Sequence, residues 1–146
     1  PWIGIYTNFT EPVEFGRNCY TTFASVLARR EMLEEVGLLY EGIFMYCDDS
    51  DLCLRMQKTR WKIVMAEDTV VLHKEGASRA TSEKPFMTKV VTVSTLRFIR
   101  RQSRWAFMGM PAFIVLRLGK RIVQGEWKGA KAVCEGVMEF VREPMP

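Results

Sequence analysis

The chain has 146 residues, of which 48% are hydrophobic and 26% charged, so a folded domain is expected and a long disordered chain is excluded. Its four cysteines are scattered without a C-x-x-C pair, which indicates a reducing compartment rather than a disulfide framework. Charge is uneven: residues 1–78 have a net charge of −4 and residues 79–146 have +8. A basic back half suits a membrane surface, a nucleic acid or an acidic partner.

The first half of the chain predicts short elements. Short apolar stretches indicate strands, and a helical stretch followed by Gly37 indicates a short helix with a glycine stop. In chain order we expect strands and loops in 1–27, a helix at 29–36, an amphipathic helix at 48–59, and strands at 61–66 and 69–73 around a turn at Glu67-Asp68.

The second half predicts three helices, at 83–104, 111–124 and 126–142, with a break at Gly109-Met110-Pro111. No stretch reaches the roughly 18–20 apolar residues that a membrane span needs. The last two helices are amphipathic, so they suit either an anionic bilayer surface or packing on the domain with a solvated basic face. Nucleic-acid binding is not expected, because no motif of the usual set is present. In the second helix the predicted polar side comprises Arg117, Lys120, Arg121 and Gln124.

The densest polar cluster is Asp48-Asp49-Ser50-Asp51, at the start of the helix expected at 48–59. A carboxylate held at a helix start can act as a general base. The alternative is helix capping, which spacing alone favours. Asp49-Ser50-Asp51 is also a D-x-D, a string too common to indicate a metal site.

His73 is the only histidine, and it ends a predicted strand beside a glycine loop. A histidine there can reach a ligand or a metal. A lone histidine without neighbouring ligands is more simply a polar residue that closes a strand.

The order of these pieces resembles the family 2 glycosyltransferases, especially their bacterial rhamnosyltransferase-like branch. Residues 22–80 carry the resemblance well and the rest of the chain only loosely. Five blocks occur in the family's order: Ala24–Glu31 (ASVLARRE), Glu35–Glu41 (EVGLLYE), Asp48–Arg55 (DDSDLCLR), Arg60–Ala66 (RWKIVMA) and Val71–Ser78 (VLHKEGAS).

The resemblance implies an α+β or partial α/β fold, namely the C-terminal portion of a GT-A fold with short strands and helices, followed by a helical tail. Residues 1–104 would be the acceptor-side part, and residues 105–146 a basic amphipathic tail. The implied activity is inverting sugar transfer from a nucleotide-sugar donor to a hydroxyl of a glycan or lipid-linked acceptor. The implied location is cytoplasmic, with contact to the membrane surface as an option.

The resemblance also implies roles for individual residues. Asp49 falls on the general base, Asp48 on its acidic neighbour, and Asp51 on a structural position. His73 falls where some related enzymes hold a divalent metal or the diphosphate. The implied substrate-binding positions are Phe23, Ala24, Trp61, Lys74 and Ser78, although core packing is the preferred interpretation for Trp61.

Three departures qualify the resemblance. Phe23 replaces a glycine that lets backbone approach the sugar, and Cys47 stands where glycine is common before the acidic pair. The nucleotide-binding half, whose D-x-D binds Mn²⁺ or Mg²⁺, is missing, so we expect weak or no activity from this chain alone.

The alternative function is a non-enzymatic fragment that binds a membrane or a partner. Apolar surface left uncovered by the missing half would favour self-association in both cases.

Overall fold

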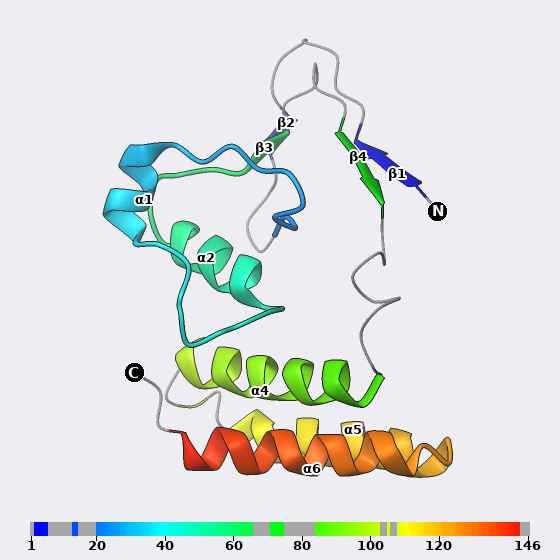
Figure 1. Ribbon diagram of the computed structural model, residues 1–146. Helices are drawn as coiled ribbons and strands as arrows, with labels where there is room; N and C mark the ends of the chain where they lie inside the picture. The colour runs from blue at the N-terminus through cyan, green and yellow to red at the C-terminus, as the bar shows by residue number, and fades with distance from the viewer. Residues whose placement is uncertain are drawn as a thin grey trace. The chain divides into compact units, whose positions relative to one another are not determined.

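The structure is a computed structural model that describes residues 2–5, 13–14, 20–65, 71–74, 84–102, 105 and 108–143. Within these ranges the chain forms five helices and four short strands (Figure 1). In chain order they are β1 (Trp2–Ile5), β2 (Val13–Glu14), α1 (Arg30–Val36), α2 (Asp48–Met56), β3 (Val64–Met65), β4 (Val71–Lys74), α4 (Lys84–Gln102), α5 (Gly109–Val123) and α6 (Trp127–Arg142).

The predicted fold class, an α+β or partial α/β portion of a GT-A fold, is wrong. The described residues are mainly helical, with helices of 19, 15 and 16 residues at α4, α5 and α6. Their strands have only two to four residues and form two separate antiparallel pairs, β1 with β4 and β2 with β3. Two-stranded pairs of this length bury little surface, so packed helices rather than a sheet organise the described chain.

The predicted helices are confirmed among the described residues, and α2 ends at Met56, before the predicted end at 59. The break predicted at Gly109-Met110-Pro111 is wrong, because α5 begins at Gly109 and contains all three residues. Gly37 ends α1 as expected, with a φ of 87° and an N–H that donates to the Leu33 carbonyl over 2.9 Å. The two strands expected at 61–66 and 69–73 are found as β3 and β4, which pair with β2 and β1 rather than with each other. The turn expected between them lies outside the described residues.

The chain divides into two compact units. The first combines Pro1–Leu39 with Asp49–Ala77, and the second combines Tyr40–Asp48 with Ser78–Pro146. In this division α4 belongs to the same unit as α5 and α6. The functional division predicted at residue 104, between an acceptor-side part and a basic tail, remains a prediction.

In the first unit, Arg55 joins α2 to the end of α1. Its guanidinium lies 2.9 Å from the Asp51 carboxylate and donates to the carbonyls of Val36 (2.6 Å) and Leu38 (2.7 Å). The carbonyl of Gly37 accepts a third backbone bond of 3.3 Å. The last carbonyls of a helix have no partner within it, so one cation satisfies the end of α1 and neutralises Asp51, which is only 1% exposed.

In the second unit, small residues let α6 pack closely on α4 (Figure 1). Gly136 is buried, and a Cβ built on it would lie 3.0 Å from both the Lys89 carbonyl oxygen and Thr92 Cβ. Lys89 and Glu139 add an ion pair of 2.6 Å between the two helices. The side chains of Ala130, Ala132 and Val133 on α6 are also buried.

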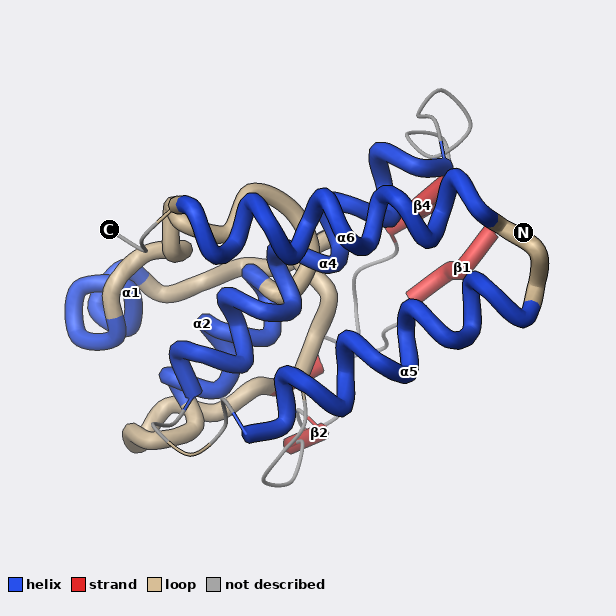
Figure 2. Tube along the Cα trace, turned by 90° about the horizontal axis from the view of Figure 1, so that it is seen from below, coloured by secondary structure: helices blue, strands red, loops and turns tan. Residues whose placement is uncertain are grey.

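α5 and α6 are joined by a short turn at Gln124–Glu126 and lie side by side (Figure 2). Within the described part of the chain, no helix is both long and apolar enough to cross a membrane.

We predict that Arg55→Met lowers the free energy of unfolding by about 3–5 kcal/mol, because it leaves Asp51 buried without a counter-charge. Urea unfolding followed by circular dichroism measures the loss. Arg30→Met is the matched control. Arg30 also forms an ion pair with an acid at a spacing of four residues, Glu34, but both side chains are exposed. The control should change stability by less than about 0.5 kcal/mol. Equal effects of the two changes would contradict the role given to Arg55.

We predict opposite effects of alanine at two helical glycines. Gly136→Ala should lower the free energy of unfolding by about 1–2 kcal/mol, because the new methyl group forces α4 and α6 apart. Gly119→Ala in α5 should raise it by about 0.5–1 kcal/mol, since nothing lies within 4 Å of the added Cβ and alanine favours the helix. Thermal unfolding of the two variants tests the pair, and stabilisation by both would show that the α4–α6 contact is loose.

Candidate functional site

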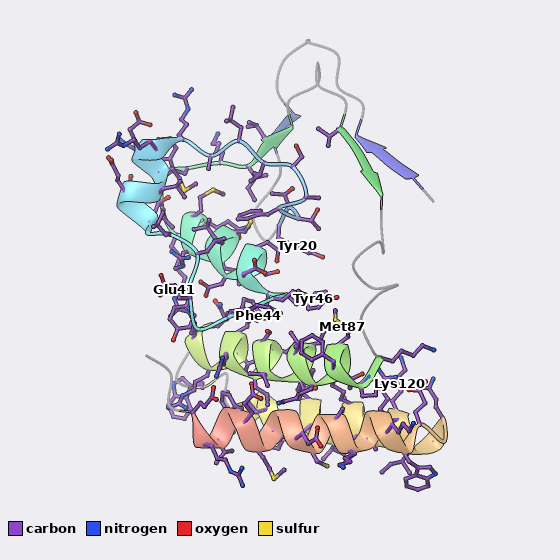
Figure 3. All side chains as sticks on the ribbon, viewed as in Figure 1. Tyr20, Glu41, Phe44, Tyr46, Met87 and Lys120 are labelled. Carbon is purple, nitrogen blue, oxygen red and sulfur yellow. The ribbon has the colours of Figure 1, made fainter. Side chains whose placement is uncertain are left out.

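The segment that leads into α2 is fastened to α4 within the second unit. Ser94 Oγ donates to the Met45 carbonyl over 2.6 Å, and Arg97 donates to the Gly42 carbonyl over 2.7 Å. The Arg101 guanidinium lies 3.7 Å from the centre of the Tyr40 ring. Phe44 and Tyr46 lie on this segment beside α4 (Figure 3). The backbone before the acidic cluster is thus held at several points.

The last two residues before α2 have an unusual backbone conformation. Tyr46 and Cys47 have φ values of 66° and 65°, in the left-handed region that favours glycine. The family resemblance places a glycine at Cys47, and the structure gives a physical reason for glycine at that position. The Cys47 thiol lies 3.9 Å from Thr95 Oγ1, a weak contact that does little to offset the strain.

The three aspartates of α2 have different surroundings. Asp51 is buried in its ion pair with Arg55, as expected of a structural residue. Asp48 and Asp49 are half-buried. One carboxylate oxygen of Asp49, Oδ1, accepts from the Ser50 N–H (2.7 Å) and the Ser50 hydroxyl (3.3 Å). Asp49 therefore satisfies a free N–H of the first turn and still carries acceptor capacity for a proton.

A cavity of about 450 Å³ lies in the first unit, next to the buried face of α2. Its walls are mostly apolar, as ligand pockets usually are. Cys53 lies in its wall, four residues after Asp49 and thus on the same side of α2. The cavity is also lined by Thr21, Phe23, Met32, Leu52, Met56 and Trp61.

The Cys53 thiol is kept protonated. Burial raises its pKa, and the negative charge of Asp49 raises it further. The thiol lies 3.9 Å from the Thr21 carbonyl oxygen, to which it donates. A protonated, buried thiol is a poor nucleophile, so Cys53 serves as a wall of the cavity.

The structure brings together only some of the predicted substrate-binding residues. Phe23 and Trp61 both line the cavity, and the Trp61 indole N–H donates to a Glu35 carboxylate oxygen over 2.8 Å. Ala24 is exposed and does not line it. In β4 the backbones of His73 and Lys74 pair with Ile3 and Trp2, but their side chains lie outside the described part, as does Ser78.

Metal ligation by His73 thus stays a prediction. Among the described residues, no group of three His, Cys, Asp or Glu side chains is arranged to hold a metal ion.

Neither the cavity nor the place of Cys53 in its wall was predicted from the sequence. A signal was present: Leu52, Cys53 and Met56 follow helical spacing on one side of α2, while Asp51 and Arg55 occupy another. The spacing predicts a buried face, but it does not show that the face borders a space instead of close-packed side chains.

Comparison with known proteins gave no match, whether to a family model, to a curated protein or to a solved structure. The functional interpretation therefore depends on the motifs and on the site geometry.

We predict that Cys47→Gly raises the free energy of unfolding by about 0.5–1 kcal/mol, because glycine adopts a φ of 65° without strain. Chemical denaturation measures the gain. Phe44→Gly, in the same segment but at an ordinary φ and with an exposed side chain, should instead lower stability by a similar amount. A loss of stability in Cys47→Gly would show that the thiol contact outweighs the backbone strain.

Proposed function

We propose that this chain is the acceptor-side part of an inverting glycosyltransferase, with Asp49 as the general base. The acceptor is a hydroxyl of a glycan or of a lipid-linked glycan, and the donor is a nucleotide sugar. The proposal concerns the site and not the fold class, since one chemistry occurs on several folds.

The observation that carries the proposal is the separation of the acidic cluster into distinct environments. Arg55 neutralises Asp51, so that carboxylate is occupied in holding α1 and α2 together. Asp49 sits in the first turn, half-buried and outside any ion pair among the described residues. It is also the residue that the family resemblance places as the base. A base needs fixed placement and access to its substrate, and Asp49 combines both.

The cavity supplies the second support. It begins one helical turn from Asp49 and has apolar walls that include the rings of Phe23 and Trp61. Such walls suit the less polar face of a sugar or the lipid portion of a lipid-linked acceptor. In this proposal the cavity holds the acceptor while its hydroxyl faces Asp49.

The proposed reaction is a single displacement. Asp49 takes the proton from the acceptor hydroxyl while the hydroxyl oxygen forms a bond to the anomeric carbon of the donor sugar. The bond from that carbon to the nucleoside diphosphate breaks on the opposite face, and the diphosphate leaves with the bonding electrons. One displacement inverts the anomeric configuration.

The donor nucleotide and the expected Mn²⁺ or Mg²⁺ belong to a nucleotide-binding part beyond these residues. We also propose a cytoplasmic location, which the family resemblance implies.

We predict that Asp49→Asn in the full-length enzyme lowers the rate of sugar transfer by about 10²–10⁴-fold, the usual contribution of a general base. Release of nucleoside diphosphate from a panel of nucleotide sugars measures the rate. Unchanged circular dichroism would show that the fold is intact. Full activity in Asp49→Asn would remove Asp49 from the reaction.

Two controls accompany this experiment. Asp51→Asn should weaken folding as well as activity, because it removes the partner of Arg55. Calorimetric titration of the 146-residue chain with nucleotide sugars and Mn²⁺ should give no tight binding. Tight binding would contradict the proposed absence of the donor half.

A further inference from the structure

α5 is the least buried long helix of the described chain, with no buried residue over its 15 residues. Its outward side is apolar. Val115 is 68% exposed, Leu116 73% and Val123 88%, and Ile122 lies beside them. These positions recur seven and eight residues apart, so they form one continuous side of the helix, called here the α5 apolar face.

The arginines of α5 point the other way, against the sequence-based expectation of an outward basic side. Arg117 Nε donates to Thr92 Oγ1 over 3.1 Å, and Arg121 donates to Thr88 Oγ1 over 3.4 Å. Arg121 also pairs with Glu126 in the turn to α6. Burial and the neighbouring Arg121 charge lower the pKa of Arg117. These bonds fix the rotation of α5 and keep its apolar face outward.

Exposed tryptophans precede and follow α5 in the chain, and exposed lysines occur near its C-terminal end. Trp105 precedes α5 and is 76% exposed, and Trp127 begins α6 and is 69% exposed. Lys120 and Lys128 are exposed, and no described acidic side chain lies within ion-pair distance of either. The glutamates of this region are already occupied: Glu126, Glu135, Glu139 and Glu143 pair with Arg121, Lys131, Lys89 and Arg97.

We propose that the α5 apolar face docks on the surface of an anionic lipid bilayer. Leu116, Val123 and their neighbours enter the boundary between headgroups and acyl chains, the tryptophans lie at headgroup level, and the lysines meet the lipid phosphates. This inference does not depend on the proposed sugar transfer.

The α5 apolar face could be covered by a bilayer or by a second copy of this chain, and the charge of the lysines near it favours the bilayer. Two copies that met through this face would bring Lys120 and Lys128 against a like-charged surface, with the nearby glutamates already paired. An anionic bilayer gives those lysines a counter-charge. A bilayer also covers a narrow convex strip, whereas a stable dimer needs a broad complementary surface.

The test is co-sedimentation of the full chain with vesicles of phosphatidylcholine alone or mixed with phosphatidylglycerol. We expect binding to the mixed vesicles, a blue shift of tryptophan emission, and weaker binding as salt rises. The variant L116D/V123D should lower the partition coefficient at least about tenfold, because both side chains would enter the bilayer boundary. Its circular dichroism should be unchanged, since both positions are exposed.

L38D is the matched control, because Leu38 is 72% exposed but lies in the first unit. It should bind vesicles as the unchanged chain does. Equal losses in L38D and L116D/V123D would overturn the proposal. So would a chain that ignores vesicles and forms a dimer in sedimentation velocity that L116D/V123D dissociates, because the face would then join two copies.

Discussion

The ion pair of Arg55 with Asp51 is the constraint on which the first unit depends. A two-turn helix such as α1 has little stability of its own, and its last carbonyls have no partners within the helix. One guanidinium on α2 supplies those partners. Asp51, buried beside it, keeps the guanidinium in place and is neutralised by it. The same contact fixes α2, and α2 in turn carries Asp49 and the wall of the cavity. The ion pair that holds α1 and α2 together therefore also fixes the helix that carries the candidate site.

The second unit depends on a different principle. Its helices approach closely because Gly136 and the alanines of α6 leave space for the backbone of α4. Threonines on α4 also take part in hydrogen bonds both within α4 and between helices. Thr92 Oγ1 donates to the Thr88 carbonyl within the helix and accepts from Arg117 of α5, so polar groups in a tight contact are satisfied locally. The buried hydroxyls of Thr88 and Thr92 therefore both have hydrogen-bond partners.

The sequence predicted the helices well because their signals are local: apolar residues at helical spacing, and glycine or proline at the ends. Asp51 was correctly assigned a structural role from its place in the acidic block. The fold class was wrong because it was inferred from the family resemblance, whereas the described strands have only two to four residues and form two separate pairs. Pairing of β1 with β4 joins residues some seventy positions apart, which no local pattern reveals. The side of α5 that faces outward was also predicted wrongly, because it depends on contacts between residues far apart in the sequence. Thr92 and Thr88, 25 and 33 residues away, give Arg117 and Arg121 inward partners that no local pattern reveals.

The inward arginines of α5 also change where the charge of this protein reaches its surface. Residues 79–146 have a net charge of +8, but part of that charge lies against threonine hydroxyls and glutamates inside the helical unit. The net charge of that half is unchanged by these contacts, since its glutamates are already counted, but the place where the charge reaches the surface is different. The positive charge nearest the apolar side of α5 comes from lysines and not from its arginines, so substitution of Arg117 or Arg121 should affect the folding of the helical unit more than its attraction to anionic surfaces.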